Sequence, residues 1–377
     1  MSLLARRRPG AEVDLAAVRR AAGSVLDPEL HLTLEDAGML GEVSVDRSGV
    51  ADVTVRLTTP TCPMRERLVA DVGAAVGTVP GVTGASVTFG AMSEQERIGL
   101  ATRLRGGREV GHQFGPDSRT QIYAVASGKG GVGKSTVTAN LAVALAQEGK
   151  RVGVLDADVW GYSVPQLFGV REHPVALKGL MLPIQAHGVS LMSVGFLVGE
   201  DEPVVWRGPM LHKAIEQFLG DVYWGDLDVL LIDLPPGTGD VTLTLLELLP
   251  DAQLLAVTTP QLAAQSVAAR VGRMARDARM PVAGVVENMS SLVCSACAAQ
   301  TAIFGEGGGA RLAETIGTTL LGQVPLDVEL RTAGDRGEPA MVGAPAAASV
   351  MELRRIATHL PVVRRGLVGR SLPLTVV

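Results

Sequence analysis

The chain has 377 residues, a length that suggests two domains. Hydrophobic residues make up 47% of it but aromatic residues only 3%, so the core must be aliphatic, which suits a parallel sheet covered by helices. A net charge of −5 argues against nucleic acid as a general partner. No apolar run is long enough to span a membrane, and three cysteines do not form a disulfide framework. We therefore expect a soluble, cytoplasmic protein that binds neither nucleic acid nor membranes.

Residues 1–105 are predicted to form a small α+β domain. Helical and strand-like spacings of apolar residues alternate along it, and Asp46–Gly49 has the composition of a tight turn. We predict, in order, a helix, a hairpin, a helix, a strand and a helix, over 13–26, 43–57, 64–76, 86–89 and 94–105. Residues 106–119 combine glycine, proline and charge, and we predict a linker there.

From residue 120 to 377 strand and helix patterns alternate, which predicts an α/β domain with a parallel, doubly wound sheet. Ligands of such sheets bind at the carboxyl ends of the strands. The predicted strands are 121–126, 151–155, 189–195, 228–233, 253–258, 282–287 and 319–324. The predicted helices are 134–148, 209–220, 240–249, 262–278, 307–316 and 347–360.

The segment Gly128–Thr136 lies between a predicted strand and a predicted helix and fits the pattern GxxxxGK(S/T). Glycine lets backbone N–H groups approach a phosphate closely, and the helix N-terminus adds partial positive charge. The pattern places Lys134 at the β- and γ-phosphates and Ser135 at Mg²⁺. We therefore predict that ATP and Mg²⁺ bind here, with the nucleotide contacted by Gly128, Gly130, Gly131, Val132, Gly133, Lys134, Ser135 and Thr136.

Acidic residues follow two of the predicted strands. Asp156 and Asp158 have the i, i+2 spacing that turns two strand side chains to the same side. Four aliphatic residues end at Asp233, the form of a Walker B strand, whose acid holds Mg²⁺ through water. We assign Asp156 and Asp233 to the Mg²⁺ site with Ser135. A turn or helix-cap role remains an alternative for Asp156 and Asp158.

The last motif combines an amide with a pair of cysteines. Asn288 ends a predicted strand, where its amide could read the adenine edge or form a turn. Cys294 and Cys297 follow as a CxxC pair that can share one metal. A symmetric dimer would supply the four thiolates usual for zinc or a 4Fe–4S cluster. A redox pair, an oxidisable thiol pair and idle small residues remain alternatives. Cys62, between two prolines, is either a transient cluster ligand or a small core residue.

Taken together, these motifs resemble the Mrp family of iron–sulfur cluster carrier ATPases, within the deviant Walker A class. The resemblance rests on Gly128–Thr136, Asp156–Asp158, Trp206–Met210, Ile232–Asp240, Asn288–Ser290, Cys294, Cys297, Ile303–Gly305 and Val324–Asp327. In the first domain, Asp27–Leu30 and Leu57–Pro63 are similar to the small assembly-associated domain that precedes the ATPase in many members. The chain departs from the pattern at Tyr162, where relatives often have proline, and in Cys294–Ala299, which lacks the bulky and histidine residues common there.

The resemblance implies a homodimeric ATPase that holds a 4Fe–4S cluster between its subunits. Such a protein receives the cluster from donors and passes it to apo iron–sulfur proteins. The resemblance also implies that Lys129 crosses to the partner's nucleotide, that Asp158 positions the attacking water and that Asn288 contacts adenine. Lys129, Lys134 and Asp158 are thus the predicted catalytic residues, and Cys294 and Cys297 are the predicted cluster ligands.

Two other functions fit the same fold. A targeting or partitioning ATPase could use the cysteine pair to clamp its dimer with zinc. It would need a methionine-rich client-binding insert, a basic membrane helix or a basic DNA-binding surface, and none is evident in the sequence. An electron-transfer protein could keep a bridging cluster as a redox centre, and the sequence does not separate retention of a cluster from its release.

Overall fold

The structure is a computed structural model whose internal contacts divide the chain into two compact units. The first unit comprises Met1–Gln113, Glu172–Gln185 and Gln217–Gly225, and the second comprises Phe114–Arg171, Ala186–Glu216 and Asp226–Val377. The residues described are 13–30, 32–58, 64–105, 113–115, 118–159, 161–197, 208–237, 239–261, 269, 270, 272, 273, 275, 276, 280–293, 297 and 299–362. Most of the predicted linker, most of the predicted helix over 262–278, Cys62 and Cys294 therefore lie outside the described residues.

The first unit contains a three-stranded sheet in the order β1-β2-β3. Its elements are α1 (Leu15–Gly23), β1 (Leu40–Val45), β2 (Val50–Leu57), α2 (Arg65–Val76), β3 (Gly84–Ala91) and α3 (Glu94–Arg105). The predicted hairpin is present, because β1 and β2 pair antiparallel. The Asp46 carboxylate closes its turn by accepting the N–H groups of Ser48 and Val50, both at 2.8 Å. β3 pairs parallel with β2.

Two segments from the predicted ATPase stretch belong to this first unit. One holds the short hairpin β6 (Val175–Leu177) and β7 (Leu180–Leu182), whose Leu177 and Leu182 are buried in the same core as Val53 and Leu68. In addition, Lys178 forms an ion pair with Glu94 at the start of α3. The predicted domain boundaries at 105 and 120 stay a prediction, because the contacts group residues that are distant in the sequence.

The second unit is built on a nine-stranded sheet, of which β13-β12-β11-β4-β10-β5-β9-β8 is the main path and β14 pairs with β12. Its strands are β4 (Gln121–Ser127), β5 (Val152–Asp156), β8 (Ile184–Ala186), β9 (Val189–Ser193), β10 (Val229–Asp233), β11 (Gln253–Thr258), β12 (Val282–Val293), β13 (Gln300–Thr301) and β14 (Leu320–Leu326). The central strands pair parallel, and β5, β10 and β11 are buried along their whole length. Such strands need apolar side chains on both faces.

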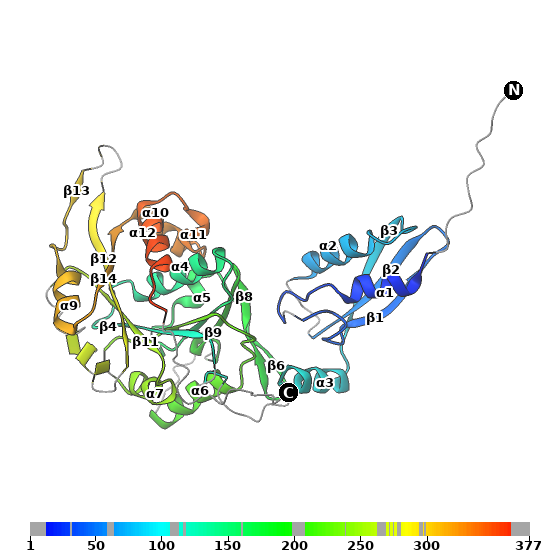
Figure 1. The fold of residues 1–377 in the computed structure, drawn as a ribbon, viewed down its shortest axis with the longest axis horizontal. Helices are drawn as coiled ribbons and strands as arrows, with labels where there is room; N and C mark the ends of the chain where they lie inside the picture. Colours follow the sequence, from blue (N-terminus) through cyan, green and yellow to red (C-terminus); the bar gives the residue numbers. More distant parts are fainter. Residues whose placement is uncertain are drawn as a thin grey trace, which may run out of the picture. The chain divides into compact units, whose positions relative to one another are not determined.

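Helices cover both faces of this sheet, which confirms the doubly wound α/β fold (Figure 1). The helices described are α4 (Lys134–Gln147), α5 (Val164–Leu167), α6 (Gly208–Gly220), α7 (Asp240–Leu248), α9 (Gly308–Ile316), α10 (Val328–Asp335), α11 (Ala340–Gly343) and α12 (Ala348–Thr358). On β12, Val286 packs in the core beneath α4 and α12, whereas its neighbour Val285 packs against α9. Successive strand residues point to opposite faces, so these helices lie on opposite sides of the sheet.

The sheet departs from the sequence prediction at two strand ends. The strand expected over 189–195 stops at Ser193 and continues as the 3₁₀ turn Val194–Leu197. The strand expected over 282–287 runs on to Val293 and pairs antiparallel with β13. Among the described residues, no helix has both the length and the apolar character needed to cross a membrane.

Candidate functional site

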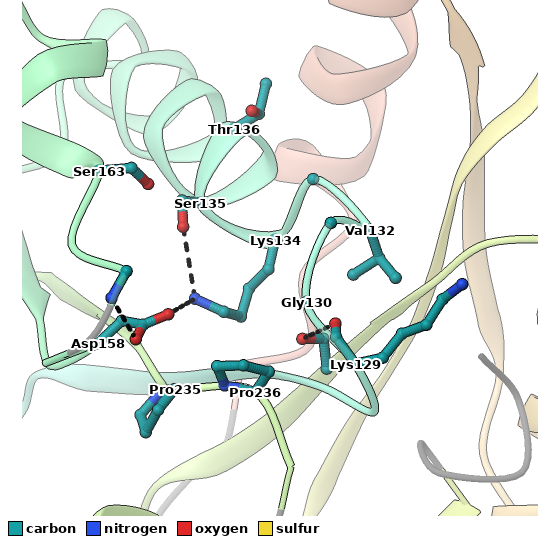
Figure 2. Close-up of a pocket in the computed structure, with 14 residues that line it drawn as sticks. Lys129, Gly130, Val132, Lys134, Ser135, Thr136, Asp158, Ser163, Pro235 and Pro236 are labelled. Carbon is teal, nitrogen blue, oxygen red and sulfur yellow. Dashed lines mark hydrogen bonds and ion pairs between the residues drawn. The ribbon is translucent and has the colours of Figure 1, made fainter. Parts of the chain in front are cut away.

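The loop between β4 and α4 has the backbone of a phosphate-binding turn. Gly131 and Gly133 adopt left-handed conformations, with φ of 78° and 79°, that other residues rarely take. Gly133 is the N-cap of α4, so the helix begins at Lys134 and directs its positive end into the loop. The loop opens onto a cavity of about 490 Å³ (Figure 2), lined by Ser127, Lys129, Gly130, Gly131, Val132, Gly133, Lys134, Ser135, Thr136, Asp158, Gly161, Ser163, Pro235 and Pro236.

Lys134 and Ser135 both reach the acid at the end of β10. The Lys134 Nζ lies 2.7 Å from Asp233 Oδ2, and the Ser135 hydroxyl donates to the same oxygen at 2.5 Å. Thr138, one turn further along α4, donates to Asp233 Oδ1 at 2.9 Å. Asp233 is fully buried and Lys134 is 6% exposed. The two motifs expected to share Mg²⁺ are therefore brought together by the parallel pairing of β4 with β10.

Asp156 lies behind this cluster, fully buried at the end of β5. Its carboxylate accepts the Ser193 hydroxyl at 3.1 Å and the Val164 N–H at 3.2 Å. Burial, together with the charge of Asp233, raises the pKa of Asp156 to about 7. A divalent cation beside these acids would favour their ionised forms, and carboxylate and hydroxyl oxygens are the ligands that Mg²⁺ prefers. The residues present thus fit Mg²⁺.

Asp158 forms part of the cavity wall. Its Oδ2 lies 3.8 Å from the Lys134 Nζ, and its Oδ1 accepts the Gly161 N–H at 3.1 Å (Figure 2). It is 6% exposed, so it is placed beside the cavity and shielded from bulk water. The loop after Asp233 forms another wall through Pro235 and Pro236.

Lys129 points away from the cluster around Lys134 (Figure 2). Its Nζ donates to Gln261 Oε1 at 2.8 Å, beyond the end of β11. The predicted catalytic lysines thus lie on different sides of the loop. One is inserted into its own acidic cluster, whereas the other is half-buried against a neutral amide.

Asn288 is buried against the back of the phosphate loop. Its Nδ2 donates to the Val132 carbonyl at 2.9 Å, and the side chain is 4% exposed. It is not among the residues that line the cavity. The structure therefore shows a loop-supporting contact for Asn288, and contact with adenine stays a prediction.

The end of β12 and β13, which flank the cysteine pair in the sequence, form an arm that projects beyond the body of the sheet (Figure 1). Leu292 and Val293 pair with Thr301 and Gln300. In the sequence, Cys294 and Cys297 stand between these two strands. Cys297 is exposed, and Cys294 is outside the described residues. Within the described part of the chain, no group of three or more histidine, cysteine or acidic side chains could hold a metal ion.

Three residues that contact this site were not predicted from the sequence. Thr138 follows Lys134 by one helical turn, and that spacing could have signalled a shared face. Gln261 follows the end of a parallel strand, where ligand-binding residues gather. Ser193 also ends a parallel strand. Their partners are distant in the sequence, so only the fold identifies the contacts.

Comparison with known families matches both parts of the chain. Residues 118–361 match the family described as NUBPL iron-transfer P-loop NTPase. Residues 15–88 match the family described as iron–sulfur cluster assembly protein. The order of the two matches is the order predicted for the small domain and the ATPase domain.

Relatives that align with nearly the whole chain share one name. The iron–sulfur cluster carrier protein of Mycobacterium bovis is 48% identical over 367 residues, covering 95% of this chain and 96% of the relative. That of Deinococcus radiodurans is 45% identical over 348 residues, covering 91% and 94%. A solved structure, the nucleotide-binding protein from Archaeoglobus fulgidus in complex with ADP, is 39% identical, with a TM-score of 0.52 over 58% of this chain and 87% of that one. The chain therefore belongs to the family of iron–sulfur cluster carrier proteins, whose NTPase domain has the P-loop fold.

Proposed function

We propose that the protein binds and hydrolyses MgATP at the phosphate loop and uses this cycle to load and transfer an iron–sulfur cluster held between two copies of the chain. One observation carries the proposal: the phosphate site is assembled within one chain, whereas the cysteine arm offers only two thiolates. A 4Fe–4S cluster usually needs four, and a twofold dimer would bring two arms together.

In the nucleotide site, each side chain has a role that follows from its charge and position. Lys134 and the loop N–H groups would bind the β- and γ-phosphates. Ser135 and Asp233 would hold Mg²⁺, with Asp156 in its outer shell, and bound Mg²⁺ would neutralise charge on the phosphates. Binding would require Lys134 to leave Asp233, from which it is now 2.7 Å away.

Hydrolysis would depend on positioning rather than on a covalent intermediate. Asp158, on the cavity wall, would orient the attacking water. Lys129 would leave Gln261 and reach the nucleotide of the partner subunit. Asn288 would contact adenine while still supporting the loop. The ADP bound by the Archaeoglobus fulgidus relative supports a nucleotide in this cavity.

The cluster is the cargo of this cycle. Cys294 and Cys297 of each subunit would bind it, and cluster donors and apo iron–sulfur proteins would be the partners. The exposed position of Cys297 suits a ligand that must give up its cargo. Cys62 of the first unit is a candidate for a transient ligand during transfer.

The decisive experiment measures iron, acid-labile sulfide and zinc per dimer after anaerobic reconstitution of the full chain. We expect about four irons and four sulfides in the unmodified protein. The variant Cys294→Ser should lose them, and Cys62→Ser, as the matched control, should keep them. Stoichiometric zinc without sulfide would overturn the carrier proposal and favour a zinc-clamped targeting ATPase.

A further inference from the structure

β12 contacts the phosphate loop before it reaches the cysteine arm. The amide of Asn288 donates to the Val132 carbonyl at 2.9 Å and is buried. Val132 and Gly133 share one planar peptide, in which the carbonyl and the N–H point in opposite directions. Gly133 lines the nucleotide cavity. Asn288 therefore holds one side of a peptide group whose other side carries an N–H that can bind phosphate.

The fit between strand and loop depends on Gly133. A Cβ atom at this position would lie 2.2 Å from Asn288 Nδ2 and 3.8 Å from the Cε of Met289. Two consecutive strand residues thus pack on the loop at a glycine whose φ is 79°. Any rotation of the Val132–Gly133 peptide must move Asn288 or break its hydrogen bond.

The residue before this contact is held by side-chain hydrogen bonds, and the pairing of β12 with β14 shifts register on both sides of it, first between Val285 and Val286. Glu287 is fully buried, accepts the N–H of Gly309 at the start of α9, and accepts the Gln323 amide at 2.6 Å. Beyond Asn288 the pairing with β14 shifts register before Leu292. Met289, within this irregular stretch, has a left-handed φ of 56° that a methionine rarely adopts. The stretch of β12 that leads to the arm therefore begins at residues that touch the phosphate loop, although Leu292 still pairs with Leu326 of β14.

We infer that Asn288 and Met289 couple nucleotide occupancy of the phosphate loop to the orientation of the cysteine arm. Phosphate binding orients the Gly133 N–H, the same peptide orients the Val132 carbonyl, and Asn288 follows it. Met289 then changes the direction of the end of β12, which is part of the arm. Asn288 acts here as a positioning residue. Its use in cluster release rests on the proposed function, whereas the coupling itself does not.

A matched control is present on α4, the helix that follows the loop. Asn140 is also buried, its amide donates to the Thr136 carbonyl at 2.9 Å, and its oxygen accepts the Met341 N–H at 3.0 Å. These bonds tie the helix after the loop to α11 rather than to β12. Removal of either asparagine deletes a buried amide beside the loop, but only Asn288 lies on the strand that leads to the cysteines.

The test follows the alkylation rate of Cys297 in the full chain, with Cys62 and Cys294 replaced by serine so that one thiol remains. Rates are measured without nucleotide, with saturating ADP, and with a saturating non-hydrolysable ATP analogue and Mg²⁺. We expect occupancy to change the rate by about five-fold or more, and Asn288→Ala to reduce this ratio to about one. Asn140→Ala should keep the ratio although it lowers stability.

Each outcome decides the proposal. The coupling is contradicted if nucleotide does not change the alkylation rate of Cys297 in the parent protein. It is also contradicted if Asn288→Ala keeps the ratio of the rates with and without nucleotide at measured saturation. If Asn288→Ala does not fold or does not bind nucleotide, Met289→Gly is judged by the same criterion. The single-thiol protein needs no cluster. If the chain binds iron and sulfide but nucleotide does not change the alkylation rate, only the coupling is contradicted. If nucleotide changes the rate but the chain binds no iron and sulfide, only the carrier function is contradicted.

Discussion

The two functional regions of the second unit differ in how much of each is built within one chain. At the phosphate loop, Lys134, Ser135 and Thr138 converge on the fully buried Asp233. At the cysteine arm, Cys297 is exposed, and the paired residues of β13 are exposed as well. The first region is assembled from buried side chains of one chain, whereas the second exposes groups that, under the proposed function, a second copy of the chain would complete.

This difference has an energetic consequence. Buried charges depend on one another, because each one loses hydration that only its partner replaces. Substitution of an exposed thiol changes the free energy of unfolding little. We therefore expect substitutions at the loop to alter both folding and activity, and substitutions on the arm to alter activity alone. The free energies of unfolding of variants in the two regions test this contrast.

The largest effect is expected for Lys134→Ala. It leaves Asp233 and Asp156 buried without their cation, so the free energy of unfolding should fall by about 3 kcal/mol. Affinity for MgATP should fall by about ten- to a hundred-fold. Denaturant titration and nucleotide titration measure the two effects. Lys129→Ala, whose lysine bonds the neutral Gln261, should change stability by less than about 1 kcal/mol. Unchanged nucleotide affinity in Lys134→Ala would contradict the assignment of the site.

A smaller loss is expected for Gly133→Ala. Alanine is strained at a φ of 79° and would clash with Asn288, so the nucleotide-free protein should lose about 2 kcal/mol. The matched control is Gly131→Ala, because Gly131 has a similar φ of 78° and no atom lies within 4 Å of the Cβ it would add. Thermal unfolding of both variants without nucleotide makes the comparison. Equal losses would show that the contact between loop and strand contributes nothing to stability.

The sequence predicted the phosphate site well because its signals are local. A strand, a glycine-rich turn and a helix follow one another, so Gly128–Thr136 defines the loop by itself. The extent of β12 could not be predicted, because Ser290 and Ser291 resemble a turn and pairing with β13 exists only once the chain folds back. Lys129 and Gln261 are 132 positions apart in the sequence, and no periodic pattern of residues can predict a contact over such a separation.

Two acids in the family-like motifs acquire structural roles that the sequence did not reveal. Asp27 accepts the N–H groups of Glu29 and Leu30 at 2.9 and 2.8 Å and so fixes the turn after α1. Asp327 caps α10 through the Glu329 N–H at 2.9 Å. A motif residue can therefore be retained for local backbone geometry as readily as for chemistry.

Gln261→Ala tests whether the neutral contact restrains Lys129. Loss of one half-buried hydrogen bond should reduce the free energy of unfolding by about 1 kcal/mol. If Lys129 acts in the partner's site, its release should also raise the ATPase rate at low protein concentration, where dimerisation limits turnover. Steady-state hydrolysis over a range of protein concentrations measures this change. A rate that falls at every concentration would indicate that Gln261 itself contributes to hydrolysis.

The smallest effect on folding is expected for Cys297→Ser on the arm. The side chain is exposed, so the free energy of unfolding should change by less than about 0.5 kcal/mol. Nucleotide affinity should also stay the same, because Cys297 does not line the nucleotide cavity. Reconstituted iron and sulfide should nevertheless disappear, because one thiolate per subunit cannot complete a four-thiolate site. A variant that lost stability along with iron would show that the arm is part of the folded core, and the contrast between the two regions would then fail.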